Sequence, residues 1–231
     1  MHEVNYIWEM QEINNSLVNH LQKEINISPA IAKVLSRRGV EDFDSAQTYF
    51  RPKWDSFHNG FDMKGMEKSI DRLRKAEIKG QNILIYGDYD VDGTCSVAMM
   101  MLFLQSLSCK VVSYQPDRET EGYGISLKSV EWMIDHEIDL VIALDCGIKD
   151  VNSAKAIKAS KIDLIICDHH TPGNELPEAF SILNPKQIDC CYPFKELCGC
   201  GVGFKLIQCY DQKFNLNLDL SSIIQLVAML L

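Results

Sequence analysis

Residues 87–93, GDYDVDG, place three carboxylates within five positions, at Asp88, Asp90 and Asp92. Like charges this close repel one another, and no need of the fold explains such a cluster. A divalent cation bound among them would offset the repulsion, because carboxylate oxygens are the ligands that hard cations prefer. The spacing therefore predicts a metal site.

The hexapeptide DYDVDG also matches the first half of an EF-hand calcium loop. That loop requires glutamate at its twelfth position, and the sequence has Met99 there. A strand-like apolar run precedes Asp88, where an EF-hand has a helix. These two departures exclude calcium sensing of the EF-hand kind.

Two further polar groups follow apolar runs later in the chain. Asp145 follows IDLVIAL, and Asp168 follows IDLIIC with His169 and His170 directly after it. If these runs are parallel strands, their carboxyl ends share one edge of a sheet, which is where ligands bind in open α/β folds. Oxygen and imidazole ligands favour Mn²⁺, Mg²⁺ or Fe²⁺, and a carboxylate that bridges two ions would suit a centre that activates water for attack on phosphorus.

Strands and helices alternate from residue 81 onwards. Short runs rich in Ile and Val predict strands at 82–87, 109–114, 138–144 and 162–167, and helix-like stretches separate them at 94–107, 126–136 and 150–160. This order predicts an α/β fold in which helices sandwich a mainly parallel sheet. Residues 1–80 read as a small helical N-terminal region, and residues 81–231 as the core domain. The arginines of the helix expected at 66–79, Arg72 among them, read as solvated charges.

Composition fits a soluble globular protein, with 46% hydrophobic and 24% charged residues among 231. A net charge of −9 argues against a generic nucleic-acid binder with a basic surface. The sequence has no secretory signal and no apolar segment long enough for a membrane span. An odd number of cysteines, nine, without an export signal favours a reducing cytoplasm.

Four cysteines cluster near the C-terminal end of the sequence, at Cys190, Cys191, Cys198 and Cys200. Their spacing, CC-x6-CxC, matches no common structural zinc pattern, and no histidine lies nearby. We expect buried thiols beside a tight glycine turn.

The motifs GDYDVDG, LDCG (144–147) and DHH (168–170) resemble the first three motifs of the DHH phosphoesterase superfamily. EGYGIS (121–126), NPK (184–186), YPF (192–194) and LCGCGVGFKL (197–206) narrow the resemblance to the bacterial single-stranded-DNA-specific exonucleases of that superfamily. The resemblance implies a metal-dependent 5′→3′ exonuclease of DNA repair and recombination that uses two Mn²⁺ or Mg²⁺ ions. Its partners would be single-stranded DNA and other repair proteins.

The resemblance also implies a role for each polar residue of the expected site. Metal ligands would be Asp88, Asp90, Asp92, Asp145 as the bridging carboxylate, and His169. His170 would face the scissile phosphate, and Asp168 would orient a histidine. Phosphate contacts are expected from Arg118, Lys186 and Lys205. Many relatives have histidine where this chain has Tyr86, which strengthens the expectation that Asp88 is a ligand.

The superfamily has a fourth motif, with a ligand aspartate after an apolar run such as IIQLVAMLL. Here the last acid, Asp219, precedes that run. We therefore expect a C-terminally truncated chain without the fourth motif, the DHHA1-type domain and the oligonucleotide-binding domain, and with weak or no activity alone. Two alternatives stay open: a small-substrate phosphodiesterase or pyrophosphatase of the same superfamily, and a non-catalytic metal-binding fragment.

Overall fold

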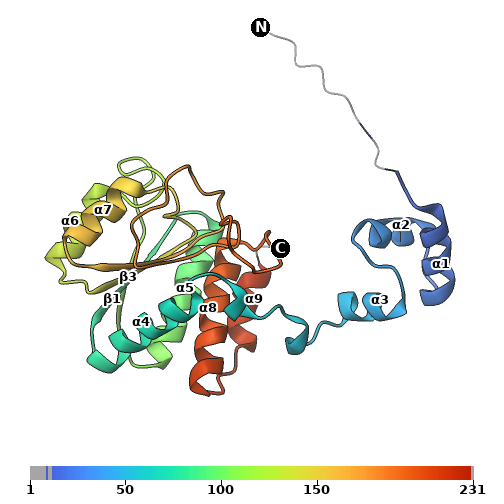
Figure 1. Cartoon of the computed structure of the whole chain (residues 1–231). Helices are drawn as coiled ribbons and strands as arrows, with labels where there is room; N and C mark the ends of the chain where they lie inside the picture. Colours follow the sequence, from blue (N-terminus) through green and yellow to red (C-terminus); the bar gives the residue numbers. More distant parts are fainter. Residues whose placement is uncertain (1–8, 10–11, 230–231) are drawn as a thin grey trace, which may run out of the picture. The chain divides into compact units, whose positions relative to one another are not determined.

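The computed structural model describes residue 9 and residues 12–229, which divide into two compact units between Phe57 and His58. The first unit contains α1 (Asn15–Ile25), α2 (Pro29–Arg37), α3 (Phe43–Phe50) and the short 3₁₀ turn η1 (Trp54–Ser56) (Figure 1). Its helices begin where the sequence supplies caps. The Ser28 side chain caps α2 ahead of a proline at the first helical position, and Asp42 forms a capping box at α3.

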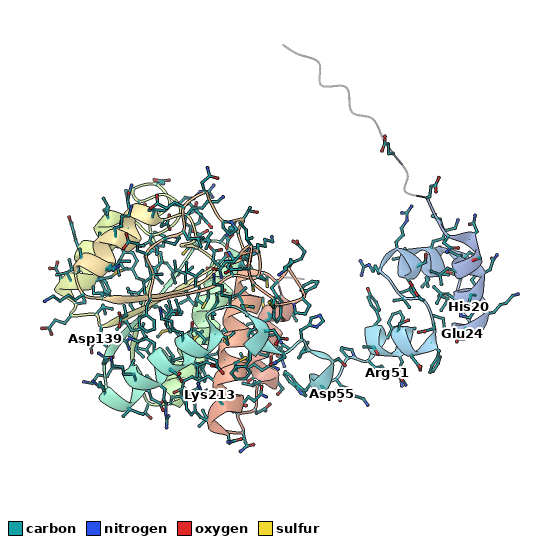
Figure 2. The ribbon with its side chains drawn as sticks, viewed as in Figure 1. His20, Glu24, Arg51, Asp55, Asp139 and Lys213 are labelled. Atoms are coloured by element: carbon teal, nitrogen blue, oxygen red, sulfur yellow. The ribbon has the colours of Figure 1, made fainter. Side chains whose placement is uncertain are left out.

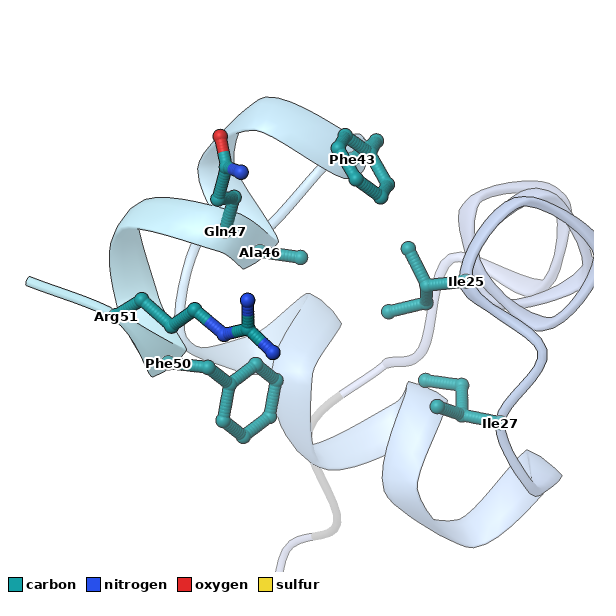
Figure 3. A pocket seen from close by; sticks show the side chains of 7 residues that line it. All are labelled: Ile25, Ile27, Phe43, Ala46, Gln47, Phe50 and Arg51. Atoms are coloured by element: carbon teal, nitrogen blue, oxygen red, sulfur yellow. The ribbon is translucent and has the colours of Figure 1, made fainter.

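A small apolar core holds these three helices together. Its buried members are Val18, Leu21, Ala32, Leu35, Val40 and Ala46. The outer surface of α1 carries polar pairs such as His20 and Glu24, whose side chains lie 2.8 Å apart (Figure 2). This unit has a cavity of about 480 Å³. Figure 3 shows the side chains that line it, which are mostly apolar, with Gln47 and Arg51 as the polar members.

The second unit is built on a five-stranded sheet. Its strands are β1 (Asn82–Gly87), β2 (Lys110–Tyr114), β3 (Leu140–Leu144), β4 (Asp163–Cys167) and β5 (Ser181–Leu183). All neighbouring strands run parallel, in the order β2-β1-β3-β4-β5. The predicted α/β class with a mainly parallel sheet is confirmed.

Helices cover both faces of this sheet (Figure 1). The helices are α4 (Met66–Lys79), α5 (Val91–Ser106), α6 (Leu127–Asp135), α7 (Val151–Ala159), α8 (Gly199–Phe214) and α9 (Ser221–Ala228), with a 3₁₀ turn η2 (Gly60–Asp62) before them. Ile83 and Ile85 of β1 pack with α4, α5 and α8, whereas Leu84 and Tyr86 pack with α6 and α7. Because both faces of the sheet are buried here, the central strands β1, β3 and β4 are apolar along most of their length, which is why they were recognisable in the sequence. No helix in the described part of the chain is long and apolar enough to cross a membrane.

Three features differ from the expectations. The division of the chain falls at residues 57 and 58, because α4 buries Met66, Ile70 and Leu73 in the core that it shares with the sheet. The strand β5 was not predicted. The glycine-rich segment at 199–203 is the first turn of α8 and not a tight turn, and a side chain at Gly203 would come within 3.0 Å of Leu144 on β3.

Arg72 corrects the expectation of a solvated helix charge. Its residue is 4% exposed, and its guanidinium donates to Asp163 (2.5 Å), Gln81 (3.0 Å) and the carbonyl of Asp139 (3.2 Å). These partners lie at the starts of β1, β3 and β4, so a single side chain ties α4 to three strands.

We expect Arg72→Leu to lower the free energy of unfolding by about 2–4 kcal/mol, because it leaves Asp163 and two partly buried acceptors without their donor. Lys75→Leu is the matched control on the same helix, since Lys75 is exposed and its loss should change stability by less than about 0.5 kcal/mol. Urea denaturation of the two variants compares them directly. Equal stabilities would show that the guanidinium network contributes nothing.

Candidate active site

Three aspartates lie side by side at the carboxyl edge of the sheet. The last residues of β1, β3 and β4 are in register: Gly87, Leu144 and Cys167. An aspartate directly follows each strand, so Asp88, Asp145 and Asp168 lie at the same level at the ends of three neighbouring strands. The strand order reverses between β1 and β3, which is the switch point where open α/β sheets bind ligands.

Five side chains at this edge form two groups with metal-ligand geometry. The first group consists of Asp88, Asp90 and Asp145, and the second of Asp145, His169 and His170. In each group, one ligand atom from each residue lies within 4.8 Å of the others. Asp145 belongs to both groups. This is the arrangement that a bridging carboxylate between two ions requires.

The carboxylates of Asp88 and Asp145 fit a bound cation. These residues are 2% and 1% exposed, and within the described residues the Oδ1 atom of each is buried and accepts no hydrogen bond. Nε2 of His169 lies 3.2 Å from Asp145 Oδ1, in contact but not in hydrogen-bonding geometry. An unsatisfied buried carboxylate oxygen costs about 1–3 kcal/mol or more, and a divalent ion would remove that cost.

The protonation of this edge reflects the crowding of its acids. Burial raises the pKa of Asp145 to about 7, and the nearby charges of Asp92 and Asp90 act in the same direction. Burial, with the charge of Asp90, also raises the pKa of Asp88. A cation would reverse this balance, because it favours the charged forms.

Two helix N-termini offset part of the repulsion within GDYDVDG. Asp90 is the N-cap of α5 and accepts a hydrogen bond from the amide of Gly93 (2.9 Å). Asp92 accepts hydrogen bonds from the first two amides of α8, those of Gly199 and Cys200, each at 2.7 Å. Both carboxylates therefore meet the positive end of a helix dipole.

Asp92 is also an expected metal ligand, and that role stays a prediction. It lies outside both ligand groups in the described part of the chain, and its Oδ2 atom is 3.8 Å from Nε2 of His169. Its hydrogen bonds join the first turn of α5 to the start of α8 beside the site.

Asp168 is placed to orient His170. Its Oδ1 atom lies 2.8 Å from Nδ1 of His170 and also accepts the amides of His169 (2.7 Å) and His170 (3.1 Å), while Oδ2 accepts the amide of Ile148 (3.0 Å). Burial opposes the charge, but these hydrogen bonds hold the pKa of Asp168 below its ordinary value. The contact with Asp168 raises the pKa of His170 in turn.

Of the three expected phosphate contacts, Arg118 is the one with a direct link to the acidic edge. Its guanidinium lies over the ring of Tyr89, 5.4 Å from the centroid, and its charge offsets a small part of the rise that burial causes in the pKa of nearby Asp88. Lys186 pairs with Glu196, at 3.4 Å.

Lys205, the third expected phosphate contact, has a buried side chain. It is 4% exposed, and its ammonium group donates to the carbonyl of His58 (2.9 Å) and to Gln208 (2.8 Å). Burial lowers the pKa of Lys205. The side chain therefore fastens the segment before η2 to α8, and a phosphate contact by Lys205 stays a prediction.

Two further residues support the site without having been assigned that role from the sequence. Asn184 directly follows β5, is fully buried, and donates to the carbonyl of His170 (2.9 Å). Tyr86 stands where many relatives have histidine, but its hydroxyl donates to the carbonyl of Gly124 (2.8 Å). The signal for Asn184 was its position after an apolar run in the NPK motif.

Comparison with known proteins places this edge in a family. The model described as "DHH family, N-terminal domain" matches residues 82–230, which is more than half of the chain. The chain belongs to the DHH family. The match begins at β1 and includes every described residue of the two ligand groups.

Relatives of this DHH chain include exonucleases. The single-stranded-DNA-specific exonuclease RecJ of Bacillus subtilis (strain 168) is 42% identical over 199 residues, which are 86% of this chain and 25% of the relative. RecJ of Escherichia coli (strain K12) is 33% identical over 184 residues, 78% of this chain and 31% of the relative. The DHH chain thus spans about a quarter to a third of the length of these curated relatives.

Solved structures agree with the fold. The structure of exonuclease RecJ bound to manganese is 28% identical, with a TM-score of 0.66 over 72% of this DHH chain and 42% of that chain. RecJ of Thermus thermophilus in complex with Mn²⁺ has a TM-score of 0.74 at 22% identity, over 93% of this chain and 30% of that one. The second likeness concerns the fold alone.

Proposed function

We propose that this chain forms the metal-binding, catalytic portion of a single-stranded-DNA exonuclease that hydrolyses phosphodiester bonds with two divalent ions, Mn²⁺ or Mg²⁺, in DNA repair in the cytoplasm. The observation that carries the proposal is the shared position of Asp145. It belongs to both ligand groups, and its buried Oδ1 atom accepts no hydrogen bond within the described residues.

The relatives support the substrate class and the metal. The RecJ proteins of B. subtilis and E. coli are single-stranded-DNA-specific exonucleases, and the solved RecJ structures hold manganese. The chemistry of the site agrees, because carboxylate and imidazole ligands without thiolate suit Mn²⁺ and Mg²⁺.

Two ions bound at such a site lower the pKa of water and neutralise charge on the phosphate and the departing oxygen. The residues of this chain then have separable tasks. Asp88, Asp90, Asp92, Asp145 and His169 would hold the ions, and Asp168 fixes the ring of His170, which would face a phosphate oxygen. Arg118 is the candidate cation for a flanking phosphate, because it lies exposed over Tyr89 at the end of β1.

Calorimetry and a cleavage assay test this proposal. Titration of the 231-residue chain with Mn²⁺ should reveal two bound ions. With the chain in molar excess over a 3′-labelled single-stranded oligonucleotide, the label should appear in progressively shorter fragments, and a duplex of the same sequence should stay intact.

Other outcomes would contradict the proposal in recognisable ways. Turnover of a dinucleotide with no shortening of the long strand would point to a small-substrate phosphodiesterase. A chain that binds no Mn²⁺ would be a non-catalytic relative. Stepwise shortening of a 5′-labelled strand, with the label retained, would reverse the proposed 5′→3′ polarity.

A further inference from the structure

The loop of residues 121–126, EGYGIS, lies against the metal-binding edge and is fixed at several positions. Glu121 accepts hydrogen bonds from Tyr114 (3.0 Å) and Ser126 (2.6 Å). The carbonyl of Gly124 accepts the Tyr86 hydroxyl, and the amide of Ile125 donates to Asp150 (2.7 Å). The backbone around Tyr123 is therefore held by the strands and helices of the core.

Tyr123 extends from this loop to two residues of the candidate metal centre. Its hydroxyl donates to the backbone carbonyl of Asp145 (3.1 Å) and also lies 3.1 Å from Nδ1 of His170. The rings of Tyr123 and His170 meet edge to face, with centroids 5.7 Å apart. One hydroxyl thus contacts two of the three residues in the ligand group of Asp145, His169 and His170.

The contact with Asp145 matters because that residue has a strained backbone. Its φ of +61° is in the left-handed region, which costs a non-glycine residue about 1–2 kcal/mol. Such a conformation persists only where its surroundings hold it. The amide of Asp145 is bound to the carbonyl of Cys167 (2.9 Å), and Tyr123 binds its carbonyl, so both sides of the residue are fixed.

We propose that Tyr123 is a positioning residue of this site: its hydroxyl holds the backbone of Asp145, which would bind the ions, and the ring of His170, which would face the phosphate. The inference rests on the proposed function, since it assigns Tyr123 a task within that centre. Groups that orient metal ligands typically change metal affinity by about 10–100-fold when they are removed.

Tyr123→Phe tests the inference, because it removes the hydroxyl and keeps the half-exposed ring. We expect Mn²⁺ affinity measured by calorimetry to fall about 10-fold. In the metal-free chain, the side-chain ¹⁵N and ¹H resonances of His170 should shift. The midpoint of urea denaturation should fall slightly, as for the loss of a single hydrogen bond.

Tyr114→Phe is the matched control. It deletes a hydroxyl that binds the same loop at Glu121, so it should cost similar stability but leave Mn²⁺ affinity and the His170 resonances unchanged. Equal Mn²⁺ affinity and unmoved His170 resonances in Tyr123→Phe would overturn the inference.

The failure of the proposed function is distinguishable. If the wild-type chain bound no Mn²⁺, the metal centre itself would be refuted. The His170 resonances of the metal-free variants would still show whether Tyr123 holds that ring.

Discussion

Asp145→Asn is expected to abolish Mn²⁺ binding by this chain and to stabilise the protein in the absence of metal. Metal binding is lost and stability is gained because the same carboxylate would bind the ions but destabilises the folded chain when no metal is present. It is 1% exposed, it stands beside Asp88 and Asp90, and its Oδ1 atom accepts no hydrogen bond within the described residues. An amide carries no charge to repel these neighbours, and it cannot bridge two cations as a carboxylate does.

The gain in stability should depend on pH. Burial raises the pKa of Asp145 from 3.8 to about 7, so the folded chain keeps a proton that the unfolded chain has lost. The stability contributed by this group is full below pH 3.8 and is lost as the pH rises through about 7. Asparagine does not titrate, so the advantage of the variant should grow across that interval, to an order of 2–4 kcal/mol above it.

Urea denaturation in a chelator at pH 5 and pH 8 measures this growth, and calorimetry with Mn²⁺ measures the loss of binding. Asp139→Asn is the control, because the Asp139 carboxylate lies at the opposite end of β3 and accepts the amide of Asn82 (2.9 Å) (Figure 2). It should bind Mn²⁺ like the wild type. A variant at residue 145 that kept two ions would remove the bridging carboxylate from the mechanism.

The sheet and its acidic edge could be predicted because they follow from short, local patterns. A strand buried on both faces is apolar at each position, so the runs before Asp88, Asp145 and Asp168 were visible. Their convergence then followed from parallel pairing alone. The three aspartates lie close together because Gly87, Leu144 and Cys167 are in register and each aspartate is the first residue after its strand.

The sequence could not predict the features that depend on contacts between segments far apart in the chain. The side chains of Arg72 and Lys205 are of types that are usually exposed to solvent. Arg72 is buried because its hydrogen-bond partners lie at the starts of three strands. Lys205 is buried where it donates to the carbonyl of His58. Asp92 has the spacing of a metal ligand, but nothing in the sequence indicated that its carboxylate also accepts the amides at the start of α8, more than a hundred residues later. Local propensity also misjudged the glycines at 199–203, because close packing overrides their weak preference for helix.

Gly199→Ala is expected to weaken Mn²⁺ binding at least about 10-fold and to lower the free energy of unfolding by about 1–3 kcal/mol. Gly199 is the first residue of α8, and a methyl group there would lie 2.5 Å from Cβ of Asp145 and closer still to its Oδ1 atom. Neither atom belongs to a free side-chain end, since Asp145 is buried and its backbone is fixed on both sides. Either α8 or the bridging carboxylate must therefore move.

Gly201→Ala supplies the control on the same helix turn. A methyl group there meets side-chain atoms of Leu197 and Cys198 at 3.2 Å and 3.4 Å, so small adjustments accommodate it. Alanine also favours helix over glycine by about 1 kcal/mol, which should leave this variant close to the wild type in stability and in Mn²⁺ affinity. If both variants bound Mn²⁺ equally well, the close approach of α8 to Asp145 would not be what shapes the site. A loss of Mn²⁺ affinity in Gly199→Ala but not in Gly201→Ala would show that the absence of a side chain at residue 199 is needed to accommodate the Asp145 carboxylate.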